Sequence, residues 1–200
     1  MQLTVPIFPL NISVLPQEFL PLHIFEDRYK RMVSKCIEDN TKFGIVYKYD
    51  DKLANIGCLV SINSVLKEYD DGKYDIVVKG SKRFEIINLN KKYDLWCGDI
   101  DILNEHYELM NKQYFSKVLD KYLQFLLSLN IEGFNIQNEM DKKNSFDFTK
   151  NVIIPNEIKQ EFLELQDEEE RMFFIDSFLD SAIKSSKGNQ KIAFKGQNLN

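Results

Sequence analysis

The spacing of apolar residues changes once along this chain, near residue 105. Before that point, short runs rich in β-branched and aromatic residues predict strands, at 3–8, 43–47, 56–65, 74–78, 83–89 and 95–103. After it, apolar residues recur at helical spacing, over 110–127, 158–163 and 172–183. The sequence therefore predicts a mixed α+β fold, with a β part followed by a helical part.

One helix interrupts the predicted β part. Apolar residues from Tyr29 to Ile37 fall on one helical face, and the charged residues Lys30, Arg31 and Lys35 fall on the other. A helix with one apolar stripe suits a position over a sheet or the mouth of a barrel. Two turns are also predicted, a tight hairpin at 70–73, where Asp-Gly tolerates positive φ angles, and a second turn at 80–81.

The helical part is less regular. A polar, asparagine-rich stretch at 130–151 predicts a connector with a short helix in it, and Asp167 with Glu170 resembles a helix-starting capping box. From about residue 186 the periodicity ends, which predicts a flexible tail. The expected organisation is a β-barrel subdomain at 1–105, a helical subdomain at 106–185 and a basic tail at 186–200.

Composition narrows the classes of partner. Lys and Arg number 26 against 31 Asp and Glu, so the net charge is −5, which disfavours general attraction to nucleic acid or anionic membranes. No apolar run approaches the roughly 18 residues of a membrane span. The three cysteines lack metal-ligand or disulfide-framework spacing, which favours reduced thiols and a cytoplasmic protein.

Sequence patterns typical of catalysis and cofactor binding are missing. Neither a P-loop nor a GxGxxG pattern occurs, and no GxSxG elbow is present. His23 and His106 stand far apart without other ligands at metal-binding spacing, and the acidic run at 167–170 is explained by a helix start. No catalytic residue, cofactor-binding residue or metal ligand is therefore predicted.

The most specific pattern lies between residues 7 and 29, where Pro9, Pro16 and Pro21 are rhythmically placed. Each proline lacks a backbone donor, so this segment should form short extended pieces along a sheet edge. Its letters, FPL, VLP and LPLHIFE followed by RY and later FGIV, closely resemble the N-terminal substrate-binding domain of Lon proteases, the LON domain. The pattern residues in this chain are Pro9, Leu10, Leu15, Pro16, Pro21, Leu22, Phe25, Glu26, Arg28, Tyr29, Gly44, Gly57, Gly72, Gly80, Arg83 and Phe84.

The resemblance covers about residues 1–185 and implies a PUA-like β pseudo-barrel with a capping helix, followed by a C-terminal helical subdomain. Most pattern residues are expected to be structural. Asp27 stands where the family commonly has proline. Charged groups among aromatic residues need a partner, so Glu26 is expected to pair with Arg28 or Arg83.

Whole Lon proteases also carry an ATPase module and a Ser-Lys peptidase, and neither is expected here. The resemblance therefore implies a non-catalytic module that recognises unfolded or hydrophobic protein segments or docks to a specific protein partner, serving as a proteolysis adaptor. The tentative polypeptide contacts are Phe19, Leu20, Tyr47, Tyr49, Phe134 and Phe146.

Three alternatives stay open. Related PUA-like barrels bind RNA, although the negative charge and the lack of a basic stripe interleaved with aromatic residues disfavour that function here. A small-molecule pocket has no motif to support it. Homodimerisation through the long helix after residue 105 is the third.

Overall fold

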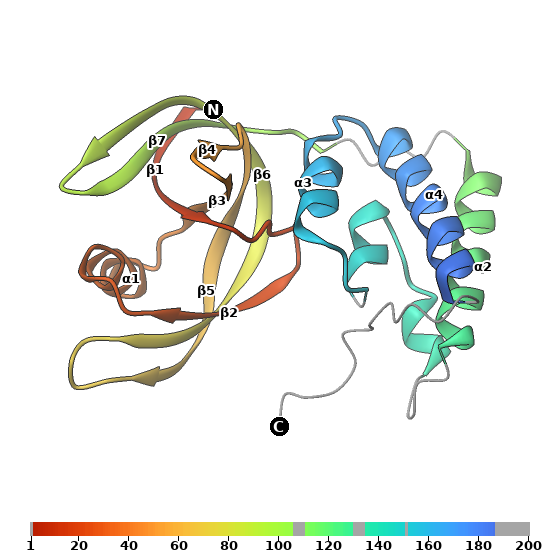
Figure 1. The fold of residues 1–200 in the computed structure, drawn as a ribbon, viewed down its shortest axis with the longest axis horizontal. Helices are drawn as coiled ribbons and strands as arrows, with labels where there is room; N and C mark the ends of the chain where they lie inside the picture. Colours follow the sequence, from red (N-terminus) through yellow and green to blue (C-terminus); the bar gives the residue numbers. More distant parts are fainter. Residues whose placement is uncertain (1, 106–110, 130–134, 151, 187–200) are drawn as a thin grey trace. The chain divides into compact units, whose positions relative to one another are not determined.

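The computed structural model describes residues 2–105, 111–129, 135–150 and 152–186 (Figure 1). These residues form two compact units. Unit 1 contains the described residues up to Asn104 together with Asn156–Glu164, and unit 2 contains the rest. Helix α3 (Asn156–Glu164), expected in the helical subdomain, therefore groups with the β part instead. The expected tail at 186–200 lies almost wholly outside the described residues.

The strands of unit 1 close into a barrel. Antiparallel pairs join β1 to β7, β7 to β6, β6 to β5 and β5 to β3, and a parallel pair between β3 and β1 completes the ring. Strand β2 adds to β6 and β4 adds to β3. The strands are β1 (Gln2–Leu10), β2 (Phe19–Ile24), β3 (Phe43–Tyr49), β4 (Lys52–Leu53), β5 (Ile56–Glu68), β6 (Tyr74–Lys92) and β7 (Leu95–Ile102).

Strand β1 changes partner halfway along its length. Its residues from Gln2 to Ile7 pair with β7 on one edge, and its residues from Ile7 to Leu10 pair with β3 on the other. The proline-rich segment was expected to form edge pieces. Strand β2 meets that expectation, since β6 is its one strand partner among the described residues. Strand β1 meets it in part, because each of its halves has one strand partner, although the two halves together close the barrel.

The two predicted turns have different outcomes. The hairpin at 70–73 is confirmed, with Gly72 at φ +78° and its N–H donating to the Tyr69 carbonyl at 2.8 Å. The turn at 80–81 is wrong, because β6 runs on through both residues. Gly80 pairs with Val60 and Lys82 pairs with Leu59, so Ser81 is the extra residue of a β-bulge.

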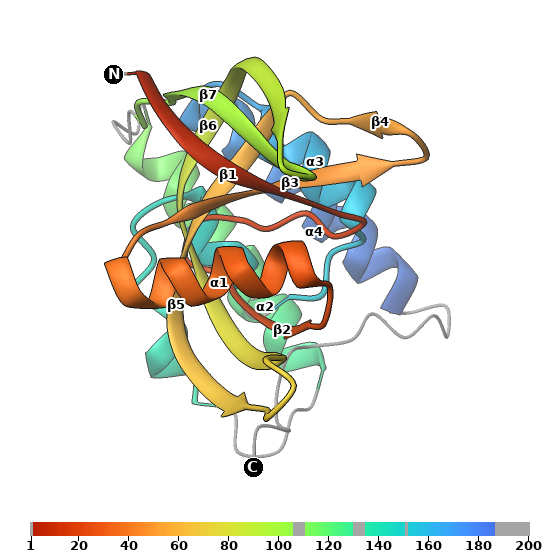
Figure 2. The ribbon, with the colours of Figure 1, turned by 90° about the vertical axis from the view of Figure 1, so that its left-hand side faces the viewer.

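Helix α1 (Asp27–Asp39) forms as predicted and buries Tyr29, Met32, Val33 and Cys36. It ends at Asn40, whose left-handed φ of 50° stops the helix. The helix lies between β1 and the β5–β6 hairpin (Figure 2), where its buried stripe joins an apolar cluster with Phe8, Phe43 and Ile76. A second cluster, around Ile7, Phe84 and Ile100, fills the other part of the barrel.

Buried polar contacts attach α3 to the barrel. The Lys159 ammonium donates to the Glu18 carboxylate at 2.6 Å, and the Ser13 hydroxyl donates to the Gln160 amide oxygen at 3.0 Å. The Arg83 guanidinium donates to the Leu163 carbonyl at 2.6 Å. Each pair satisfies polar groups that would be costly to bury alone, which explains why α3 joins unit 1.

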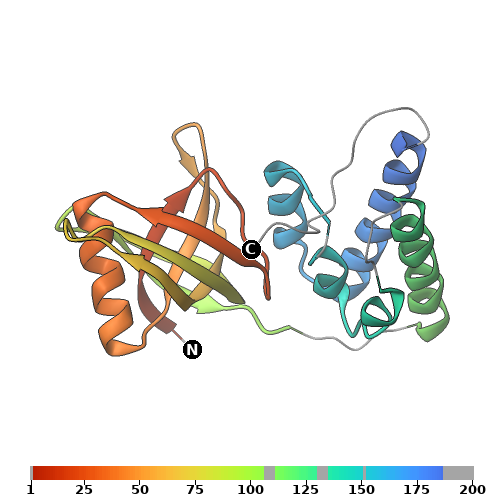
Figure 3. The same ribbon diagram turned by 90° about the horizontal axis from the view of Figure 1, so that it is seen from below.

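Unit 2 contains α2 (Lys112–Ser128), α4 (Glu168–Ser186) and two short 3-10 helices, η1 (Ile136–Glu139) and η2 (Ser145–Thr149). Helices α2 and α4 pack side by side (Figure 3). The expected cap of α4 is confirmed, since the Asp167 carboxylate accepts from the Glu170 N–H at 2.8 Å. Glu168 is almost fully buried and bonds Arg171, which has no exposed surface.

Candidate functional site

Helix α1 supplies one wall of a groove in unit 1. Its buried stripe faces the barrel, so the flanking positions project along the rim. Arg28, Arg31 and Lys35 follow one another at spacings of three and four residues, which places them on one side of a helix, and all three line the groove. Lys42 continues this wall just after the helix. The first wall is therefore strongly basic.

The opposite wall is a strand edge. Four consecutive residues of β1, from Leu3 to Pro6, line the groove. Successive side chains of a strand point to opposite faces of the sheet. Four consecutive residues can therefore line the same groove only if the groove runs along the edge of the strand. Strand β7 occupies one edge of this stretch, and β3 joins the other edge only from Ile7 onward. Among the described residues, no strand pairs with the groove-side edge of 3–6.

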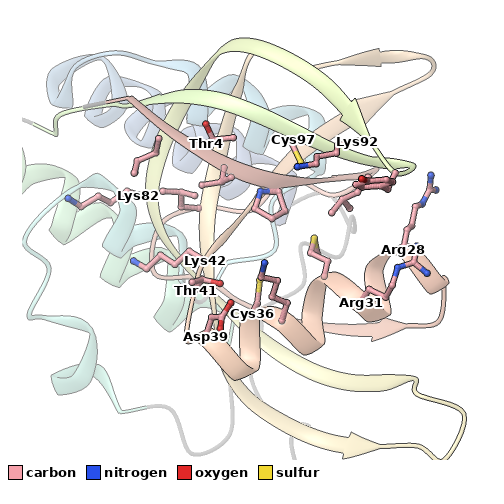
Figure 4. Close-up of a pocket in the computed structure, with 18 of the residues that line it drawn as sticks. Thr4, Arg28, Arg31, Cys36, Asp39, Thr41, Lys42, Lys82, Lys92 and Cys97 are labelled. Carbon is pink, nitrogen blue, oxygen red and sulfur yellow. The ribbon is translucent and has the colours of Figure 1, made fainter.

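The floor of the groove is apolar. Met32 and Leu95 belong to one core cluster, and Leu59 and Ile102 belong to the other, so the groove opens where the two clusters meet. Its volume is about 760 Å³, within the range of pockets that hold ligands. Figure 4 shows Cys36 and Cys97 facing the groove from α1 and β7. Burial raises the pKa of the Cys36 thiol, which is therefore uncharged at neutral pH.

Cations dominate the rim. Six of the nineteen lining residues are Lys or Arg and one, Asp39, is acidic. Arg28 is paired with Glu26 at 2.6 Å, and Lys42 donates to the Ser81 hydroxyl at 3.2 Å. Arg31, Lys35 and Lys82 are exposed, and no carboxylate of the described chain lies within ion-pair distance of them. The groove thus combines an apolar floor with an excess of positive charge on its rim.

Most residues of the sequence pattern support the fold. Leu15, Pro16, Tyr29, Gly44, Gly57, Gly80, Arg83 and Phe84 are buried. Glu26 pairs with Arg28, one of its two expected partners, and the Arg28 guanidinium also donates to the Asp94 carbonyl at 3.4 Å. Arg83 lies elsewhere, against α3. Of the sixteen pattern residues, Arg28 alone lines the groove.

The predicted polypeptide contacts do not gather at one place. Phe19 and Tyr49 are exposed and Leu20 is partly buried, but none of them lines the groove. Two predictions are wrong as surface contacts: Tyr47 is buried and its hydroxyl donates to Glu157 at 3.2 Å, and Phe146 has no exposed surface. Phe134 lies outside the described residues.

The groove could not be predicted from the sequence, because its lining comes from five separate segments of the chain. The one local signal was the basic face of the predicted helix, Lys30, Arg31 and Lys35, of which Lys30 does not line the groove. The groove also has three cations outside the helix, Lys42, Lys82 and Lys92. They come close to the basic face of the helix only when β1 and β7 close the barrel. Among the described residues, no cluster of three or more His, Cys, Asp or Glu could hold a metal ion, and no helix is long and apolar enough to cross a membrane.

Comparison with known proteins gives one family. A model of the ATP-dependent protease La (LON) substrate-binding domain matches residues 4–180. The Lon protease of Flavobacterium johnsoniae is 25% identical over 145 residues, which are 68% of this chain and 18% of that protein. The Lon protease of Parabacteroides distasonis is 27% identical over 111 residues, 51% of this chain and 13% of that protein. The chain thus spans less than a fifth of these relatives.

Solved structures share the fold. A Lon N-terminal domain protein from Xanthomonas campestris matches with a TM-score of 0.71 at 18% identity, covering 88% of this chain and 98% of that one. The N-terminal domain of a Mycobacterium avium complex Lon protease matches with a TM-score of 0.68 at 16% identity, covering the same 88% and 98%. Both the barrel and the helical part therefore follow a known arrangement.

Proposed function

The chain belongs to the ATP-dependent protease La (LON) substrate-binding domain family, and from this premise we propose that it binds unfolded or hydrophobic segments of other proteins in the groove of unit 1. It does so as a binding module, without chemistry of its own. The observation that carries the proposal is the unpaired edge of β1 along an apolar floor.

A strand edge favours an extended polypeptide as the occupant. Backbone N–H and C=O groups on such an edge can pair with an added strand whatever its sequence. The apolar floor then takes side chains from alternate positions of that strand. A folded protein hides both its backbone and its apolar side chains, so the groove would discriminate against it.

The proposal is tested by fluorescence anisotropy with a labelled, permanently unfolded apolar polypeptide. Leu95→Gln places a polar amide in the groove floor, and we expect the dissociation constant to rise about tenfold, which corresponds to about 1.4 kcal/mol of lost apolar contact. Far-UV circular dichroism verifies that the variant is folded. A folded protein of similar size should not bind.

Leu66→Gln is the matched control, because Leu66 is 62% exposed on β5 and lies outside the groove. It should bind like the unchanged protein. The proposal fails if neither protein binds the unfolded chain, or if the two leucine substitutions weaken binding equally. Docking of a specific protein partner would then be the better account.

A further inference from the structure

The cations of the groove stand at its two ends. Figure 4 shows Lys42 and Lys82 toward one end and Arg28 and Arg31 toward the other, with the apolar floor between them. Lys82 comes from β6, Lys42 from the segment after α1, and the two arginines from α1 itself. Asp39 lies at the same end as Lys42 and Lys82, which outnumber it. A ligand lying along the groove would therefore meet an excess of positive charge on both sides of an apolar centre.

These charges contrast with the rest of the molecule. The chain carries a net charge of −5, yet cations outnumber acids six to one in the groove. Arg31, Lys35 and Lys82 have no carboxylate of the described chain within ion-pair distance. Clustered like charges repel one another, and a ligand of opposite charge relieves that repulsion.

We propose that the groove selects extended polypeptide segments in which an apolar centre is flanked on both sides by Asp or Glu. This proposal rests on the proposed function and adds the class of segment that is bound. The apolar centre lies on the floor near Met32, Leu59 and Leu95. The acidic flanks reach Lys42 and Lys82 at one end and Arg31 at the other, where Arg28 is already paired with Glu26.

Nucleic acid fits the same charges less well. Proteins that hold single strands stack bases on aromatic side chains. Tyr93 is the one aromatic residue among the lining residues, and its side chain is 87% exposed at the rim. The remainder of the floor is aliphatic or sulfur-containing, which suits Leu, Ile, Val and Met side chains of a polypeptide.

Three labelled synthetic peptides test the selectivity. They share a central run of leucine and valine and differ in carrying two aspartates, two serines or two lysines on each side. At low ionic strength we expect the aspartate-flanked peptide to bind about tenfold tighter than the serine-flanked one, and the lysine-flanked peptide to bind most weakly. Raising the salt concentration should shrink these differences, because the rim charges are exposed.

Charge-reversal variants of the rim lysines and arginines provide a second test of the selectivity. Arg31→Glu with Lys82→Glu reverses one exposed cation at each end of the groove and should abolish or invert the preference for aspartate over serine. Lys52→Glu with Lys112→Glu is the matched control, since both lysines are exposed, lie outside the groove and change the net charge equally. The control should keep the full preference.

The outcomes separate the two proposals. If all three peptides bind equally to the unchanged protein, or if the control pair loses the preference as well, the acidic selectivity is wrong and the proposed function stands. If none of the peptides binds, the proposed function itself fails. If a single-stranded RNA binds more tightly than the aspartate-flanked peptide and displaces it, the groove is a nucleic-acid site and the selectivity proposal falls.

Discussion

At the scale of single residues, Gly80 shows how closely the barrel is packed. A Cβ atom at this position would lie 2.1 Å from the Leu15 carbonyl oxygen, nearer than any real contact. The Gly80 N–H donates to the Glu18 carbonyl, and the Gly80 carbonyl accepts from the Gln17 N–H, both at 2.9 Å. The loop before β2 is thus fixed directly on the bulge of β6.

We expect Gly80→Ala to lower the free energy of unfolding by about 3 kcal/mol, because either the loop or β6 must move to admit the methyl group. Urea denaturation followed by far-UV circular dichroism measures this loss. Gly72→Asn is the control. Gly72 has φ +78°, which Asn tolerates, and a Cβ there would meet only the Lys30 side chain at 4.0 Å, so the loss should stay below about 1 kcal/mol. Equal losses would refute the steric account.

At the scale of elements, Asp147 holds η2 together. Its buried carboxylate accepts from the backbone N–H groups of Lys143 at 2.8 Å and Asn144 at 3.2 Å, and pairs with the Lys150 ammonium at 2.5 Å. Burial raises the pKa of Asp147, but the bonds from Lys150 and the two N–H groups outweigh it. The pKa therefore lies below the ordinary 3.8.

A carboxyl group with a lowered pKa stabilises the fold above its unfolded pKa of about 3.8, and the contribution disappears as the pH falls through the folded value. Asp147→Asn should therefore cost about 1.5 kcal/mol at pH 7 and much less near pH 2.5. Urea denaturation at both pH values measures the difference. Asp141→Asn, at an 82% exposed side chain, should cost almost nothing at either pH, and a loss at Asp147 that does not depend on pH would contradict the argument.

Elements with a strong local signal could be predicted from the sequence, and those placed by distant contacts could not. Helix α1 and the hairpin at Gly72 follow from periodicity and turn chemistry. The bulge at Gly80 looked like a turn, because only the approach of Leu15 shows why glycine is needed there. Helix α3 was expected in the helical subdomain, because the contact between Lys159 and Glu18 that attaches it to the barrel joins residues far apart in the sequence.

The same limit applies to the candidate site. A strand edge becomes available only when β1 changes partner at Ile7, which is a property of the closed barrel. The rim cations are spread from Arg28 to Lys92 along the chain. Exposed aromatic residues were therefore chosen as contacts, and Tyr47 and Phe146 proved to be buried.

At the scale of the whole molecule, the two compact units can be followed by different spectroscopic signals. Trp96, the one tryptophan, lies on β7 of unit 1 beside the cluster around Ile100. In unit 2, Arg171 is fully buried and bonds Glu168 at 3.1 Å, Glu105 at 3.1 Å and the Leu165 carbonyl at 3.0 Å. Removing this arginine leaves Glu168 buried without its main counter-charge.

We expect Arg171→Ala to destabilise unit 2 by about 3 kcal/mol, because an unpaired buried charge is costly. On heating, the helical signal in circular dichroism should fall at a lower temperature, while the transition in Trp96 fluorescence should stay where it was. Lys143→Ala, at a 75% exposed side chain, should move neither signal. A Trp96 transition that shifts together with the helical signal would show that the units unfold as one.

The membership of α3 in unit 1 bears on how the protein is made. A ribosome releases residues 1–104 first and then 105–155 before it reaches Asn156–Glu164. The nascent barrel must therefore wait for more than fifty further residues before Lys159 can neutralise Glu18 and Leu163 can accept from Arg83. Until then Glu18 and Arg83 lack these two contacts, so unit 1 can be completed only after the intervening segment of unit 2 has been made.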